Sequence, residues 1–262
     1  MRRRRVFVAA ALLALSAAGC GGKEDGREGG REGGRKGGLA CPPARMVLDI
    51  GHTPEAPGAI AASGATELSF NIRFADRLAH RLTEAGLATG MIRIDGDDPL
   101  LKRRVAAIAA YEPALIVSIH HDSVQERHLR ARVVDGVERT YTDQAAGFST
   151  FVPAETPHAG PSLETARRIA DALHAVGERP SLHHAEAIEG EGRRLLDAAR
   201  GIYAGDFLKL LRTAPAPAVL VEVGVIKNPA EERRLADPAT VDALAGAMAA
   251  AILSAPCPAI GR

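Results

Sequence analysis

The pattern of apolar and polar positions predicts buried strands that end in polar residues. Val47, Leu48 and Ile50 form a short apolar run that stops at Gly51 and His52, which is typical of a buried strand followed by a loop. Similar runs predict four more strands, of which the last two should lie side by side, at 87–94, 114–119, 203–211 and 217–226. His52 therefore falls at the carboxyl end of a strand, the edge where open α/β sheets bind ligands.

Helical spacing of apolar residues alternates with these strands and predicts helices at 65–82, 100–110, 162–176 and 241–253. Gly86 is a suitable C-terminal cap for the first helix. In the second, Lys102, Arg103 and Arg104 should form a basic outer face, and residues 124–160 suggest an extended hairpin or strand pair. The alternation predicts one α/β domain whose mostly parallel, twisted sheet of about six strands is flanked by helices, with an active site at the strand carboxyl ends.

The start of the chain predicts export. Arg2 to Arg5 precede an apolar stretch, 6–15, that is too short to span a bilayer as a mature helix. The run that ends at Cys20 resembles the lipobox of bacterial lipoproteins, which predicts a signal peptide over 1–19 and a lipid on Cys20. Ala17 stands where lipoboxes usually have leucine, so ordinary cleavage that leaves a free thiol is the alternative. With the lipid, the chain would be a periplasmic, membrane-anchored lipoprotein.

Glycine, arginine and glutamate dominate the next segment. Residues 21–38 contain nothing apolar, so 20–40 should be a flexible tether, or a spacer that serves only solubility. The catalytic domain is then expected over 41–257 and a short tail over 258–262. Cys41 and Cys257 flank that domain and are expected to form a disulfide, because the exported compartment permits one.

Charge excludes one class of partner. The formal net charge is +1, but residues 1–19 hold four arginines and no acid, so the remainder carries 29 basic and 32 acidic side chains. A net charge of about −3 implies no basic surface for nucleic acid. With six Phe, three Tyr and no Trp, the core must be built from smaller aliphatic residues.

A second strand also ends in residues that can bind a metal ion. The buried run before position 120 leads directly into His120 and His121. Neighbouring side chains of a strand point to opposite faces, so only one imidazole should face an ion. Glu67 lies in the first turn of the first helix, where the helix dipole alone would favour a carboxylate. His52, Glu67 and one of the two histidines would supply three ligands of the kinds that zinc accepts.

Glu222 interrupts a run, 217–226, that is otherwise wholly apolar. Burying an unpaired carboxylate costs several kcal/mol, and no basic residue in the run is available to pair with it. The position therefore indicates a metal, a cation or a catalytic role.

These residues belong to motifs that follow one another in a fixed order: Asp49–His52, Glu67 with Asn71, Ser118–His120, and Pro217–Gly224 followed by Asn228–Glu232. Together, over residues 45 to about 253, they resemble the zinc-dependent N-acetylmuramoyl-L-alanine amidases of bacterial cell walls. The resemblance implies that His52, Glu67 and His120 bind Zn²⁺ and that Glu222 is the catalytic acid and base. It also implies the substrate, peptidoglycan, and the bond, the amide between N-acetylmuramic acid and L-alanine.

Three positions depart from the family pattern, of which Lys227, where the family often has serine, is regarded as neutral. Ile50 stands where proline is common, and His121 stands where the family usually has a small residue. The choice of His120 as ligand therefore rests on strand register and on the resemblance. His121 and Asp122 are expected beside the ligands or in the cleft, where Asp122 would orient a ligand.

Residues 183–200 are dense in polar groups. His183, His184 and Glu186 taken alone would suggest a second metal site, but ligand-type side chains also crowd ordinary loops. The favoured interpretation is a loop or short helix that borders the cleft and contacts peptide or restricts entry, with Glu186 as a cleft residue.

Two other functions compete with an exported zinc amidase. One keeps the zinc site on a different substrate, as a peptidase or deacylase, and the other is a cell-wall binding protein that has lost catalysis. Retention of all four expected site residues argues against the latter. The expected partners are peptidoglycan and, through a lipid on Cys20, a membrane; the need for a protein activator stays open.

Overall fold

The computed structural model describes residues 45–255, which lie within one compact unit of the chain, Gly38–Arg262. The expected signal peptide, the lipid-bearing Cys20, the tether, the Cys41–Cys257 disulfide and the tail all fall outside the described residues. They stay predictions.

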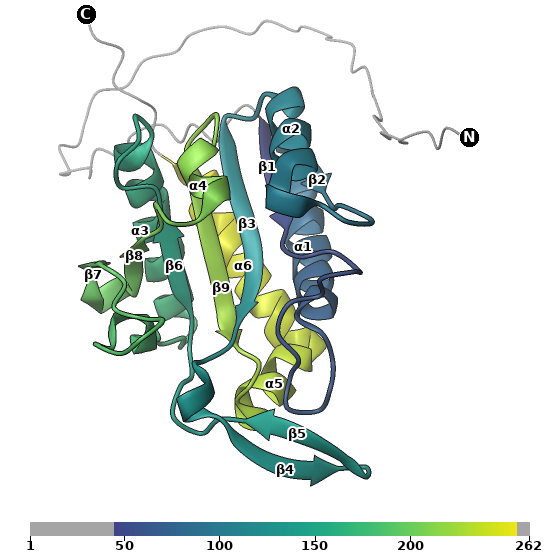
Figure 1. Cartoon of the computed structure of the whole chain (residues 1–262). Helices are drawn as coiled ribbons and strands as arrows, with labels where there is room; N and C mark the ends of the chain where they lie inside the picture. Colours follow the sequence, from purple (N-terminus) through teal and green to yellow (C-terminus); the bar gives the residue numbers. More distant parts are fainter. Residues whose placement is uncertain (1–44, 256–262) are drawn as a thin grey trace, which may run out of the picture. The chain divides into compact units, whose positions relative to one another are not determined.

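A central sheet is built from the strands β1 (Arg45–Ile50), β2 (Ala88–Ile92), β3 (Leu115–Asp122), β6 (Ser149–Val152), β7 (Leu195–Asp197), β8 (Ile202–Ala204) and β9 (Ala218–Val225). Their order across the sheet is β2, β1, β3, β9, β6, β8, β7 (Figure 1). The first four run parallel, β6 is antiparallel to β9, β8 is parallel to β6, and β7 is antiparallel to β8. The expected mostly parallel α/β sheet is confirmed, with seven strands instead of about six.

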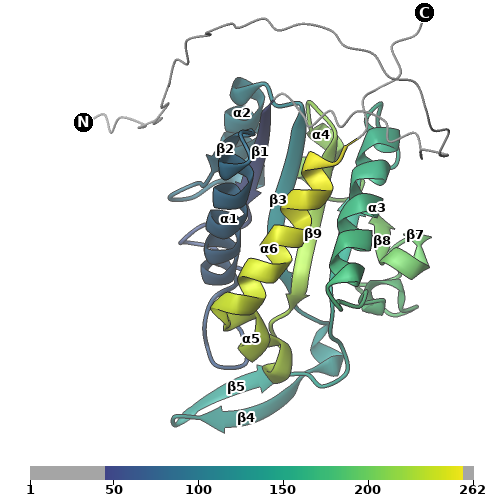
Figure 2. The same ribbon diagram turned by 180° about the vertical axis from the view of Figure 1, so that it is seen from behind.

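Helices cover both faces of this sheet. On one face, α6 (Pro238–Leu253) lies between α1 (Glu67–Glu84) and α3 (Ala159–Ala175) (Figure 2). On the other lie α2 (Lys102–Tyr111) and the short α4 (Lys209–Thr213), while α5 (Pro229–Ala236) leads into α6. Successive side chains of β1 point to opposite faces of the sheet. Leu48 therefore packs into the core with α1, α3 and α6, and Val47 packs into the core with α2 and α4. The four expected helices are confirmed.

The stretch 203–211 differs from its prediction as one strand beside 217–226. Only Ile202–Ala204 is extended, and the chain turns at Gly205 and Asp206 before α4 begins. β6 lies between β8 and β9. A short apolar run does not by itself distinguish a buried strand from a buried helix, and Leu210 and Leu211 are buried as part of a helix.

The hairpin expected within 124–160 is confirmed in part: β4 (Arg130–Val134) and β5 (Val137–Tyr141) form a separate two-stranded sheet, whereas the later apolar stretch, 147–152, contributes β6 to the central sheet. The turn of the hairpin is made by Asp135 and Gly136, both with positive φ, the conformation that tight hairpin turns require. Figure 1 shows the hairpin beyond the ends of β3 and β9 at which these strands finish.

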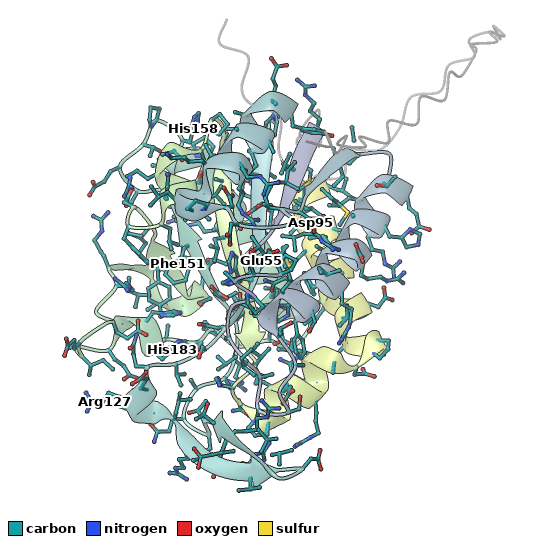
Figure 3. The ribbon with its side chains drawn as sticks, turned by 45° about the vertical axis from the view of Figure 1, so that its right-hand side comes forward. Glu55, Asp95, Arg127, Phe151, His158 and His183 are labelled. Atoms are coloured by element: carbon teal, nitrogen blue, oxygen red, sulfur yellow. The ribbon has the colours of Figure 1, made fainter. Side chains whose placement is uncertain are left out.

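Two irregular segments lie along the edge where β1, β3 and β9 end. One joins β1 to α1, and the other, 176–194, joins α3 to β7. Figure 3 shows both in one view, labelled at Glu55 and His183. They supply residues to the site described below.

Within residues 45–255, no single helix has the length and apolar character to cross a membrane. The pair α5 and α6 passes that test only when taken together, across a bend of 80°. α6 packs against α1 and α3, as a core helix does.

Candidate metal centre

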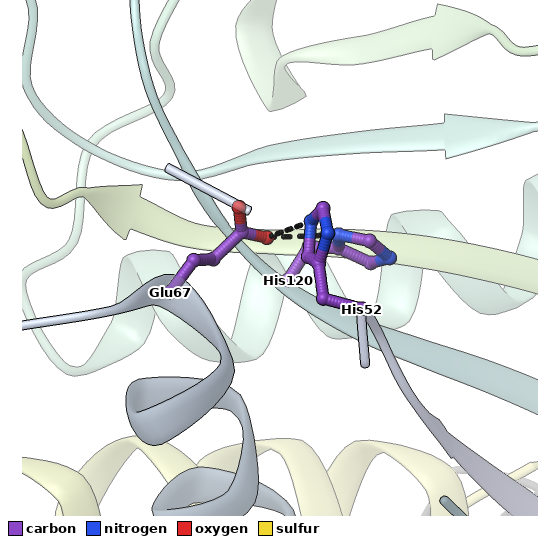
Figure 4. A group of neighbouring side chains, drawn as sticks. All are labelled: His52, Glu67 and His120. Atoms are coloured by element: carbon purple, nitrogen blue, oxygen red, sulfur yellow. Dashed lines mark hydrogen bonds and ion pairs between the residues drawn. The ribbon is translucent and has the colours of Figure 1, made fainter. Parts of the chain in front are cut away.

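Three side chains from separate elements meet at the carboxyl ends of β1 and β3. His52 follows β1, Glu67 is the first residue of α1, and His120 lies near the end of β3. Glu67 Oε1 lies 2.9 Å from His52 Nε2 and 2.9 Å from His120 Nδ1 (Figure 4). The structure thus brings together the three residues that the sequence suggested as metal ligands.

The arrangement suits one metal ion. A ring nitrogen from each histidine and one carboxylate oxygen all lie within 4.8 Å of one another, and two imidazoles with one carboxylate are a ligand set that zinc accepts. Two glycines keep the space clear. A Cβ on Gly51 would collide with the His120 ring, and one on Gly58 would collide with the Glu67 carboxylate and the His52 ring. The residues present therefore fit a divalent metal ion.

Local hydrogen bonds fix Glu67 at the start of α1. Thr66 caps the helix by accepting a hydrogen bond from Ser69 N, and Glu67 Oε2 accepts one from Ala59 N at 3.0 Å. Burial would raise the pKa of Glu67, but hydrogen bonds to His120 and His52 outweigh it and hold the pKa well below its usual range. Glu67 is therefore an anion, as a metal ligand must be.

Arg104 is not on the outer face of α2 as expected; only 2% of it is exposed. Its Nη1 donates to Asp49 Oδ1 at 2.5 Å and to the carbonyl oxygen of Ile50, and its Nη2 donates to the carbonyl oxygen of His52 at 2.6 Å. Ser118 Oγ donates to the other Asp49 oxygen at 2.6 Å. These bonds tie the end of β1 to α2 and β3, and they hold His52 at a φ of 71°, which is uncommon for a residue other than glycine.

The ion pair of Asp49 and Arg104 was missed in the sequence, although a signal for it was present. Asp49 interrupts the apolar run of β1 in the same way that Glu222 interrupts that of β9. The reasoning applied to Glu222, that a buried carboxylate needs a partner, applies equally to Asp49. The sequence alone did not indicate that the partner comes from α2.

His121 points away from the three converging residues. Its ring is buried against Phe70 and Phe74, and its Nδ1 lies 2.8 Å from Asn71 Oδ1. Burial lowers the pKa of His121 to about 3, so the ring is neutral. Asn71 in turn donates to Glu67 Oε1 at 3.4 Å, which makes His121 a support for the ligand set.

Glu222 lies beside His120 on the neighbouring strand, where the two residues are register partners of β3 and β9. Its Oε2 is buried and has no hydrogen-bond partner among residues 45–255. Burial, with the negative charges of Asp122 and Glu67, raises the pKa of Glu222 well above its usual value. The structure thus places next to the candidate metal ligands a carboxyl group that holds a proton readily.

Two cavities adjoin these residues. The one beside His52 has a volume of about 580 Å³, and the one beside Glu222 has a volume of about 310 Å³. His120, Leu208 and Leu220 line both cavities. An extended substrate therefore has room on two sides of the candidate metal centre.

The remaining cleft candidates group separately. Asp122 Oδ2 lies 2.9 Å from His184 Nε2 and 3.4 Å from His183 Nε2, away from the three converging residues. Glu186 pairs instead with His128, at 2.8 Å. Burial would lower the pKa of His184, but the carboxylates of Asp122 and Glu191 raise it to about 9.

Comparison with known proteins shows the family to which the chain is similar. A family model described as N-acetylmuramoyl-L-alanine amidase matches residues 46–254. The N-acetylmuramoyl-L-alanine amidase AmiC of Neisseria meningitidis serogroup B is 27% identical over 196 residues, which are 72% of this chain and 47% of that protein. The chain therefore spans about half the length of the curated relative it matches.

Solved structures show a similar fold. An N-acetylmuramoyl-L-alanine amidase from Clostridium difficile 630 superposes with a TM-score of 0.62 at 22% identity, covering 80% of this chain and 96% of that one. The amidase Ami1 from Mycobacterium smegmatis gives 0.60 at 24% identity, covering 79% and 94%. Because the family model spans nearly all of the described domain, including every residue of the candidate centre, this chain belongs to the N-acetylmuramoyl-L-alanine amidase family.

Proposed function

We propose that this chain hydrolyses the amide bond between the lactyl group of N-acetylmuramic acid and L-alanine in peptidoglycan, with zinc held by His52, Glu67 and His120. One observation carries the proposal: three metal-binding groups converge next to the buried carboxyl group of Glu222, in a chain of the amidase family. Family membership suggests the bond, and the side chains supply the chemistry that an amide requires.

Zinc is the metal that best suits this ligand set. A zinc ion held by these three residues would supply a water with a pKa of about 7 and would polarise the scissile carbonyl. The protein's part is to fix the ligands. Arg104 holds the backbone at His52, and Asn71 and Ala59 N hold the Glu67 carboxylate.

Glu222 is the proposed general base and acid. It takes a proton from the attacking water and then gives that proton to the amine of L-alanine as the amide bond breaks. Its raised pKa suits the second half of this task, because the group keeps its proton until the leaving amine accepts it. Its Oε2, which has no partner within the described residues, is free for that transfer.

The two cavities support a branched substrate. Hydrolysis of this bond requires a glycan on one side of the scissile carbonyl and a stem peptide on the other. The cavities that meet at His120 and Leu208 provide space on both sides.

The position of the bond that is cleaved distinguishes an amidase from a peptidase and from a deacylase. Soluble muropeptides incubated with the chain should yield, by mass spectrometry, a sugar with a free lactyl carboxyl group and a peptide with a free L-alanine amino terminus. Cleavage within the stem peptide would make the protein a peptidase, and loss of acetate alone would make it a deacylase. Either product pattern would overturn the proposed substrate bond.

The proposed site of action is the cell envelope. The signal peptide 1–19 and a lipid on Cys20 would place the domain at a membrane, with residues 20–40 as a tether toward the cell wall. The supporting observations are the charged and apolar pattern of the first twenty residues and the family to which the domain belongs.

A further inference from the structure

A second group of metal-binding side chains lies beside the first. Asp122 is the last residue of β3, and His183 and His184 open the short helix η3 (His183–Ala185). One carboxylate oxygen of Asp122 lies 2.9 Å from His184 Nε2 and 3.4 Å from His183 Nε2. The two Nε2 atoms therefore converge on the same oxygen atom.

Both histidines are held by their other ring nitrogen. His183 Nδ1 lies 2.8 Å from Ser181 Oγ, and His184 Nδ1 lies 3.0 Å from Glu191 Oε2. Metal-binding histidines almost always have this second contact, because it orients the ring and leaves the other nitrogen for the ion. Glu191 is itself held by Gln125, whose Nε2 donates to its Oε1 at 3.2 Å.

His183 shows that this group is incomplete as a hydrogen-bonded cluster. Its side chain is only 6% exposed, yet Nε2 is buried without a hydrogen-bond partner among residues 45–255. If His184 is protonated, its two N–H groups can donate hydrogen bonds to Asp122 and Glu191. Nε2 of His183 would still be unpaired, which is costly in a buried position. A cation between the three side chains would satisfy both imidazoles and the carboxylate together.

We propose that Asp122, His183 and His184 bind a second divalent metal ion of the zinc type. Two imidazoles and one carboxylate are a ligand set that zinc accepts, and the three ligand atoms lie within 4.8 Å of one another. None of them belongs to the group of His52, Glu67 and His120. The second site therefore binds its own ion.

The location of this ion gives it a structural role at the cleft. It would join the end of β3 to the segment 181–191, two parts of the chain that lie about sixty residues apart in sequence. Asp122, His184 and Glu191 line the cavity of about 310 Å³ together with His120 and Glu222. The second ion thus fixes one wall of the cavity beside the candidate catalytic carboxyl group.

Metal content per chain tests the proposal without any assay of activity. The purified chain is loaded with zinc, freed of excess metal and analysed by elemental mass spectrometry. We expect about two zinc ions per chain in the wild type, one in His183→Gln, one in His120→Ala and none in the double variant. His80→Ala removes an exposed histidine of α1 and should retain two. Circular dichroism establishes that each variant is folded.

A second readout covers the case in which His183→Gln fails to fold. In His120→Ala, which lacks the first site, added zinc should still raise the thermal midpoint of unfolding, and Asp122→Asn in that background should abolish the increase. A single wild-type zinc that is lost in His120→Ala, or equal metal content in the wild type and a folded His183→Gln, would overturn the second site. Loss of zinc from the first site alone would bear on the proposed amidase function instead.

Discussion

At the scale of single residues, the buried pair of Asp49 and Arg104 determines how His52 is presented. Asp49 accepts hydrogen bonds from both Arg104 and Ser118, and Arg104 also binds the backbone carbonyl groups of Ile50 and His52. The pair therefore stabilises the left-handed backbone at His52 from a position that the substrate does not need to reach. Arg104 is a positioning residue for the metal centre.

Replacing Arg104 tests this role. In Arg104→Met the carboxylate of Asp49 stays buried without its cation, which should lower the free energy of unfolding by about 3–5 kcal/mol and weaken zinc binding. Urea denaturation and zinc titration measure the two effects. Lys102→Met, at an exposed position of the same helix, is the matched control and should change the free energy of unfolding by less than about 0.5 kcal/mol. Equal zinc affinity of the two folded variants would contradict the positioning role.

The two candidate histidine ligands were predictable because each is a polar residue that ends an apolar run, whereas Glu67 stands where the helix dipole favours any carboxylate and was assigned through the resemblance. His52 and His120 end apolar runs, and parallel strands bring such ends to one edge of the sheet. Arg104 was not predictable in this way. Its side chain is directed inward by a carboxylate 55 residues away, and helical spacing alone assigned it to solvent.

At the scale of elements, α1 carries Glu67 at one end and anchors itself along the sheet with its apolar face. Phe74, Leu78 and Leu82 are all buried in the core that α1 shares with α6 and α3. Packing of this face, rather than the metal, therefore sets the position of the helix.

Shortening a buried side chain on the apolar face of α1 should lower the stability of the domain but leave the metal centre unchanged. Leu78 is fully buried and lies three turns from Glu67, so Leu78→Ala should lower the free energy of unfolding by about 2–5 kcal/mol, through lost burial and the cavity left behind. Thr83→Ala, at an exposed position of α1, is the control and should be nearly neutral. Zinc content per folded chain should be unchanged in both; a loss of zinc in folded Leu78→Ala would show that helix packing and metal binding are coupled.

Element types followed from the sequence wherever the apolar pattern was long. α1 and α3 agree with their predictions because their helical periodicity extends over several turns. The three strands that end at the site agree although their apolar runs are short. The stretch 203–211 did not, because Gly205 and Asp206 divide it. The Asp206 carboxylate accepts hydrogen bonds from Ala154 N and Glu155 N, and that distant contact stabilises the turn.

At the scale of the whole molecule, one described domain carries the complete candidate site, while the expected export signal, anchor and tether lie in residues 1–40. The charged and apolar pattern of residues 1–15, the resemblance to a lipobox at Cys20 and the composition of 21–38 predict those N-terminal features. A tether of this kind would let the domain act on cell wall at some distance from the membrane.

Cys41 and Cys257 provide a test at this scale. If they are paired in the exported chain, thiol labelling without reduction should modify neither, and reduction should expose both. A disulfide that closes so long a loop should stabilise the domain by about 4 to 5 kcal/mol in the chain-entropy model. Two reactive thiols at these positions before reduction would contradict the pairing.

The measurement that most directly tests the central claim is the release of peptides with a free L-alanine amino terminus from intact peptidoglycan. It compares the wild type with Glu222→Gln, each before and after treatment with a zinc chelator. The account predicts that the wild type releases these peptides, loses that activity on chelation and regains it when zinc returns, while Glu222→Gln is at least about 100-fold slower yet binds zinc normally. Release that survives chelation, or that proceeds at the wild-type rate in Glu222→Gln, would contradict it.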